Sequence, residues 1–170
     1  MRVLLLIILF IHFNIQELKA QDTLSNRIDI QIGMTRMDFF GGIQYAKEFG
    51  ALQPFIAAEI GINRTIFQSR FYPKITVGSS YFVIDKKRIS FGPQVSYAYS
   101  VLKVNANSSH FHHWNEVYAG LRLEIGSTIR FTTALSGGWM NERFYNQITQ
   151  DFAGVNSLGY SIKLGLSYAW

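Results

Sequence analysis

The chain has 170 residues, of which 48% are hydrophobic and 15% aromatic, but only 16% are charged, and it has no cysteine. So many aromatic residues exclude intrinsic disorder, and the lack of cysteine excludes a disulfide scaffold, cysteine metal sites and a cysteine lipid anchor. The net charge of +5 is spread along the chain, without the clustered basic stripe that nucleic-acid binding requires. Soluble domains usually have about 25% charged residues, so the surface of this protein needs an explanation.

The N-terminus has the pattern of a secretory signal peptide. Arg2 provides a positive charge, residues 3–13 form an apolar run, and the small residue Ala20 ends the polar stretch that follows. The run is much shorter than the roughly 20 residues of a spanning helix. We therefore expect residues 1–20 to be a cleaved signal peptide and residues 21–170 to form one domain with no transmembrane helix.

The C-terminal segment alternates strictly between two kinds of residue. The even positions are apolar, and the odd ones are small or polar: Tyr160, Ile162, Leu164, Leu166, Tyr168 and Trp170 against Ser161, Lys163, Gly165, Ser167 and Ala169. A period of two predicts a strand with two different faces. Its length matches the 9–11 or so residues of a transmembrane strand.

The same period predicts seven further strands, so that the chain would hold eight in all. They lie near residues 27–35, 39–49, 56–63, 71–81, 89–101, 117–125 and 129–136. Short joints at 50–54, 85–88 and 126–127 alternate with longer polar connections at 64–70, 103–115 and 141–157. The first hairpin, at 36–38, is the exception, because it is short although it lies on the side of the long connections. This alternation is typical of a transmembrane barrel with both termini on the short-turn side. The predicted fold is all-β: an eight-stranded antiparallel up-and-down transmembrane β-barrel.

The composition of the two faces indicates which one is outside. A soluble lipocalin-like barrel would turn its apolar face inward and cover the other face with charge, but here the second face is mostly Gly, Ser, Ala, Thr and Gln. Small residues suit a narrow eight-stranded interior. The aromatic residues of the apolar face gather at two levels, as in membrane-interface girdles: Phe39, Phe71, Tyr99, Trp139 and Tyr160 at one level, Phe49, Tyr81, Phe91, Tyr168 and Trp170 at the other. The alternative is that these residues form the core of a soluble β-sandwich.

With its signal peptide, eight amphipathic strands and terminal GYSIKLGLSYAW at 159–170, the chain resembles the small eight-stranded outer-membrane β-barrels of the OmpA/OmpX type. The resemblance implies an integral, porin-like protein in the outer membrane of a Gram-negative cell envelope, with both termini periplasmic. It also implies contact with outer-membrane lipid and lipopolysaccharide, and recognition of the last strand by the outer-membrane assembly machinery. We expect a monomer. The resemblance does not indicate an activity, because such folds host adhesins, enzymes and structural proteins.

Charged residues on the inward face predict a polar network in the lumen, nearly balanced in sign: Arg27, Asp29, Glu48, Glu59, Lys74, Arg122, Glu124, Arg130 and Lys163. The turns suggest that Glu59 lies opposite Lys74 and Glu124 opposite Arg130, close enough for salt bridges. Such a network could be a path for ions or protons. At eight strands we expect it to close the lumen instead.

Residues 108–116, which we expect to form a loop, hold three of the four histidines. The candidates for a lipid-hydrolysing triad, or for a transition-metal site built on the histidines, are Ser109, His110, His112, His113 and Glu116. The His-x-Ser spacing of lipid A deacylases is missing, so we expect an ordinary solvated loop, with no metal and no cofactor. Arg64, Arg70, Lys103 and Arg143 could meet anionic lipopolysaccharide.

The expected function is a structural or surface-recognition role carried by the long loops, without enzymatic activity. A lipid-modifying enzyme of the lipid A deacylase or acyltransferase type and a small pore are the alternatives.

Overall fold

The computed structural model describes residues 25–63, 71–86, 88–103, 111–146 and 149–170. The expected signal peptide lies outside the described residues, as do Ser109, His110 and residues 64–70 and 104–110 of the expected long connections. Among the described residues, no helix is long and apolar enough to cross a membrane.

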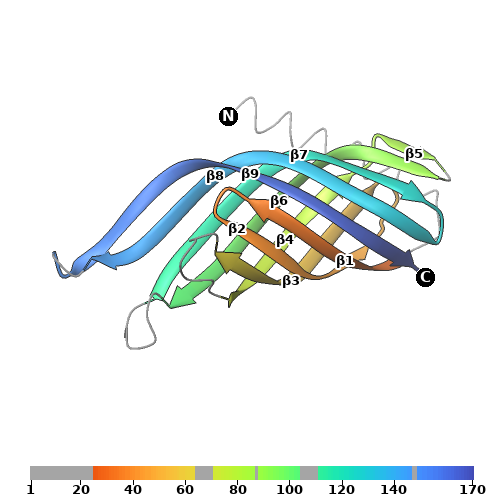
Figure 1. The fold of residues 1–170 in the computed structure, drawn as a ribbon. Helices are drawn as coiled ribbons and strands as arrows, with labels where there is room; N and C mark the ends of the chain where they lie inside the picture. The colour runs from red at the N-terminus through yellow and green to blue at the C-terminus, as the bar shows by residue number, and fades with distance from the viewer. Residues whose placement is uncertain (1–24, 64–70, 87, 104–110, 147–148) are drawn as a thin grey trace, which may run out of the picture.

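Eight long strands form one closed antiparallel barrel (Figure 1). They are β1 (Asn26–Thr35), β2 (Asp38–Lys47), β3 (Leu52–Asn63), β4 (Phe71–Tyr81), β6 (Ile89–Lys103), β7 (Phe111–Gly126), β8 (Ile129–Asn146) and β9 (Asp151–Ala169). A short ninth strand, β5 (Ile84–Lys86), pairs only with β6. The barrel closes because β4 pairs directly with β6 and β1 pairs with β9. The predicted up-and-down fold is confirmed.

The register keeps the two faces of each strand apart. Ile30 lies opposite Leu166, and these side chains are 67% and 59% exposed, whereas their neighbours Asp29 and Ser167 are 0% and 2% exposed. A shift of one residue would reverse every side chain. The buried interior is therefore mainly polar, and the only apolar cluster found among the described buried residues, Tyr72, Leu102 and Trp114, is small.

Both termini of the barrel lie at the same end. Asn26 N donates to Trp170 O and Trp170 N to Asn26 O, each at 3.0 Å, and Ala169 N donates to Thr128 O in the turn between β7 and β8. The turn between β2 and β3 lies there too, where Gly50 has a φ of 59° that glycine adopts without steric cost. We call this the turn end, and the opposite end the loop end.

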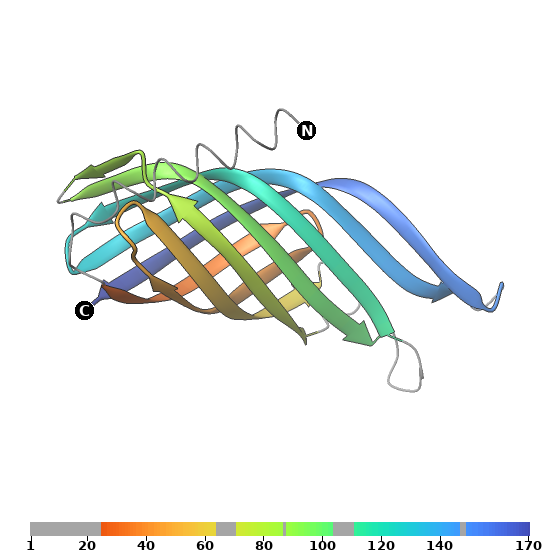
Figure 2. The same ribbon diagram turned by 180° about the vertical axis from the view of Figure 1, so that it is seen from behind.

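The expected loops at 103–115 and 141–157 were wrong in large part, because much of each belongs to a strand. Strand β7 begins at Phe111, β8 continues to Asn146 and β9 begins at Asp151. Several outward side chains are polar here, as in the Asn141–Asn156 pair at 2.7 Å, so the regular apolar alternation stops while the backbone ladder continues. The β8–β9 hairpin extends well beyond the other strands (Figures 1 and 2). The expected joint at 85–88 likewise contains part of β5.

Two adjacent glycines of β8 give a matched test of strand packing. A Cβ on Gly138 would lie 1.9 Å from Val117 O, whereas a Cβ on Gly137 would meet no atom within 4 Å. We expect Gly138→Ala to lower the free energy of unfolding by about 1–3 kcal/mol, because β7 and β8 must separate, and Gly137→Ala to behave like wild type. Urea unfolding in detergent micelles measures both. Equal unfolding midpoints would contradict the predicted close approach.

Candidate functional site

The barrel interior contains all nine of the expected lumen residues, together with Asp38 and Glu116. Each of the eleven makes at least one ion pair. Most are fully buried, and Glu48, Arg130 and Lys163 are partly buried. The pairs form two groups, which we call the turn-end cluster (Arg27, Asp29, Glu48, Arg122, Glu124 and Arg130) and the loop-end cluster (Asp38, Glu59, Lys74, Glu116 and Lys163).

Glu124 is the centre of the turn-end cluster. Its carboxylate accepts hydrogen bonds from Arg27 Nη1, from Arg122 Nε at 2.8 Å and from Arg130 Nη1 at 3.3 Å. Arg122 Nη2 also donates to Asp29 Oδ2 at 2.7 Å, and Arg27 pairs with Glu48. Three arginines thus balance three carboxylates. Since β8 and β9 lie between β7 and β1, the pairs that join Arg27 and Asp29 to β7 cross the lumen.

Lys74 connects two carboxylates in the loop-end cluster. Its Nζ lies 2.7 Å from Glu116 Oε2 and 3.3 Å from Asp38 Oδ2, and 4.8 Å from the centre of the Phe40 ring. Asp38 also accepts a hydrogen bond from Tyr72 OH at 2.5 Å. Strands β7, β4 and β2, which supply these charges, are not neighbours.

Glu59 forms the second branch of the loop-end cluster. Its carboxylate accepts hydrogen bonds from Lys163 Nζ at 2.9 Å, and from Gln31 Nε2 and Thr76 Oγ1, each at 2.7 Å. Lys163 belongs to β9 and Glu59 to β3, with β1 and β2 between them. This ion pair therefore also spans the lumen.

The exterior carries the apolar side chains that a soluble barrel would bury. Of the ten aromatic residues expected there, eight are exposed, and Tyr81 and Phe91 are half-buried. Exposed isoleucines, leucines and valines occupy many of the other outward positions of the strands, among them Ile32, Ile43, Leu135 and Leu166. An apolar band of this extent around a closed barrel fits lipid, because the backbone polar groups are paired between strands.

A comparison with solved structures supports the fold. The crystal structure of the N-terminal β-barrel domain of Pseudomonas aeruginosa OprF matches with a TM-score of 0.57 and 13% identity, over 86% of this chain and 97% of that one. The fold is that of a small outer-membrane β-barrel. A major outer membrane protein from Thermus thermophilus (TM-score 0.46, 8% identity, 85% of this chain and 99% of that one) and Neisserial surface protein A (0.45, 12%, 85% and 96%) are more distant. No family model and no curated protein matches.

Within this barrel, one of the two suggested cross-strand positions is confirmed. Glu59 does lie opposite Lys74, but its ion-pair partner is Lys163. The expected position of Glu124 opposite Arg130 was wrong: Glu124 lies opposite Thr132, and Arg130 opposite Gly126. The turn is centred one residue later than expected, and the long Arg130 side chain still reaches Glu124.

Asp38 was not expected in the barrel interior, and Glu116 was expected in a loop. Asp38 falls in the expected first hairpin, yet it shares the inward phase of Phe40, Gln44 and Ala46 on β2. Glu116 likewise shares the inward phase of Tyr118, Arg122 and Glu124 on β7. Starting each of these two expected strands one residue earlier would have found both.

The described part of the histidine-rich segment does not assemble a triad. It is strand, and adjacent strand residues point to opposite faces: His112 Nδ1 lies 3.2 Å from Glu142 Oε1, while His113 Nδ1 is hydrogen-bonded to Tyr99 on the outside. Glu116 is paired with Lys74 in the lumen. Over the part of the chain that the structure describes, no three metal-ligating side chains come together.

Proposed function

We propose that this integral outer-membrane barrel has a structural and surface-recognition role, with a lumen closed by its polar network. The observation that carries the proposal is that ion pairs join strands that are not neighbours, such as Arg27 with Glu124 and Lys163 with Glu59. Side chains that meet across the lumen occupy the space through which ions would have to move. Eight strands leave an interior only about wide enough for side chains.

Conductance tests whether the lumen is closed. We expect the refolded chain, inserted into planar lipid bilayers, to give no discrete single-channel steps. The replacement of Arg122 and Glu124 together by serine removes two crossing side chains and should allow steps to appear, provided that heat-modifiable gel mobility shows a folded barrel. Steps of the same size in the wild-type chain would support the small pore instead.

The β8–β9 hairpin is the part of the barrel best suited to surface recognition. Among the described residues, strand β9 pairs with β1 only from Ser161 onward, and residues 151–160 pair with β8. Phe152, Val155 and Leu158 are exposed on this segment, and Arg36 Nη1 donates to Leu158 O at 3.1 Å at its base. A strand edge without a neighbour can accept a strand from another protein.

The orientation in the membrane follows from the proposed role, with the loop end outside the cell and both termini periplasmic. The chain has no cysteine, so a single introduced thiol is a clean reporter. We expect a membrane-impermeant maleimide to label Thr149→Cys, in the hairpin turn, on intact cells. Ser127→Cys, in the turn between β7 and β8, should be labelled only after the outer membrane is permeabilised. The reverse pattern would contradict the orientation.

The last strand supports a further part of the proposal, that β9 is recognised by the outer-membrane assembly machinery. From Tyr160 onward its outward residues are apolar, and the rings of Tyr168 and Trp170 stack with centroids 6.1 Å apart at the barrel's end. We expect the barrel to work as a monomer in contact with outer-membrane lipid and lipopolysaccharide.

A further inference from the structure

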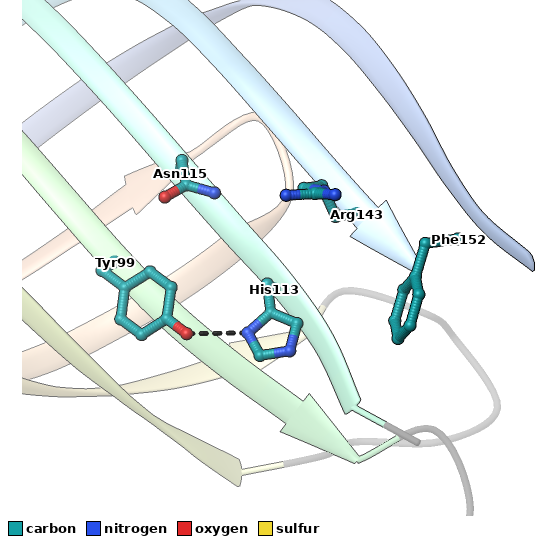
Figure 3. Close-up of a pocket in the computed structure, with 5 residues that line it drawn as sticks. All are labelled: Tyr99, His113, Asn115, Arg143 and Phe152. Carbon is teal, nitrogen blue, oxygen red and sulfur yellow. Dashed lines mark hydrogen bonds between the residues drawn. The ribbon is translucent and has the colours of Figure 1, made fainter. Parts of the chain in front are cut away.

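A hollow on the outer wall of the barrel differs from the apolar surface around it. Its volume is about 380 Å³, and it is lined by Tyr99, His113, Asn115, Arg143 and Phe152 (Figure 3). These residues belong to β6, β7, β8 and β9 near the loop end. On the same strands, towards the turn end, the outward positions are apolar again, with Val117, Trp139 and Leu158 exposed in one row.

Two tyrosines orient the polar side chains of β7. Tyr97 OH donates to Asn115 Oδ1 at 2.7 Å, and Tyr99 OH is hydrogen-bonded to His113 Nδ1 at 2.7 Å with the two rings stacked. Tyr97 OH occupies the acceptor oxygen of Asn115, so the amide NH2 of Asn115 remains as a donor. When Tyr99 OH donates to His113 Nδ1, the ring carries its proton on Nε2, which is then a second donor. Figure 3 shows the Asn115 amide nitrogen on the side of Arg143 and His113 Nε2 on the side away from Tyr99.

Arg143 adds a positive charge to these donors. It lies directly opposite His113 in the β7–β8 register, so the two side chains share the outer face. Gly154 lies opposite Arg143 on β9 and leaves space there. Among the described residues no carboxylate forms an ion pair with Arg143, and Glu142, its neighbour in sequence, pairs with His112. The hollow therefore combines hydrogen-bond donors and a cation with an aromatic wall.

We propose that this hollow binds the phosphate group of a lipid, with the acyl chains lying along the apolar row of Val117, Trp139 and Leu158. An arginine with neighbouring amide and imidazole donors is suited to phosphate oxygens. The lipid is favoured over a soluble anion because the hollow is continuous with the lipid-facing band, so one amphipathic molecule satisfies both surfaces. The inference rests on the proposed membrane location and adds a ligand class to it.

Lipid retention by the folded chain tests the site. In native mass spectrometry from neutral detergent micelles, we expect dioleoyl phosphatidic acid to bind in preference to dioleoyl phosphatidylcholine, whose phosphate is masked by choline. Arg143→Gln should weaken phosphatidic acid binding about tenfold or more, the size expected for one charge-assisted hydrogen bond. Lys86→Gln, which removes an exposed charge from β5 at the turn end, should leave binding unchanged.

Three results would overturn the proposal. They are equal binding by Arg143→Gln and wild type, equal weakening by Lys86→Gln, and competition by inorganic phosphate as strong as that by phosphatidic acid, which would indicate a soluble anion. Heat-modifiable mobility confirms that each variant is folded. Protection of the barrel from trypsin in lipid vesicles separately tests the membrane location. A chain that is protected, and therefore inserted, but shows no preference for phosphatidic acid would contradict the lipid site and not the membrane location.

Discussion

Replacement of Glu124 by alanine is expected to lower the free energy of unfolding by about 3–5 kcal/mol, the usual cost of removing one partner from a buried ion pair. Glu124 is 0% exposed and accepts hydrogen bonds from three arginines. Without it, Arg27, Arg122 and Arg130 share only Asp29 and Glu48. The turn-end cluster then holds an excess positive charge on side chains that are mostly buried.

Urea unfolding in detergent micelles, followed by heat-modifiable gel mobility, measures this effect. Glu142→Ala is the matched control, because Glu142 is also a strand glutamate in contact with a basic side chain, but it lies partly exposed beside His112. An exposed pair of this kind contributes up to about 1 kcal/mol. If Glu124→Ala and Glu142→Ala unfold at the same urea concentration, the lumen network does not stabilise the barrel.

Replacement of Lys74 by methionine is expected to be about as destabilising, about 3–5 kcal/mol. Lys74 is the only basic residue within ion-pair distance of Asp38 or Glu116 among the described residues. Methionine keeps much of the side-chain volume but leaves two buried carboxylates facing each other across the lumen. Their repulsion should open the loop end of the barrel first.

A second variant separates this charge effect from a packing effect. Lys74→Met combined with Glu116→Gln removes one cation and one anion, and so restores the net charge that wild type has at this place. We expect the double variant to be more stable than Lys74→Met alone, with a coupling energy of about 0.5–3 kcal/mol in the same urea titration. A double variant less stable than the single one would show that packing, and not charge, explains the loss.

The loop-end hollow shows why some features escape sequence analysis. His113 and Arg143 are thirty positions apart in sequence and become neighbours only through the β7–β8 register. That register depends on a turn whose centre differs by one residue from the expected one. His113 also stood in what looked like a polar loop, because the outward residues of β7 stop being apolar where the strand leaves the lipid band.

Local chemistry in the sequence was sufficient to predict the faces of the strands. Alternation along β9 predicts that Lys163 points inward and Leu164 outward, and the same pattern predicts eight strands and a polar interior, because a strand has a period of two. Only the tertiary structure decided which charges meet. Lys163 pairs with Glu59 and Arg27 with Glu124, since contacts across a lumen depend on how the strands tilt and stagger when the barrel closes, which no local pattern records.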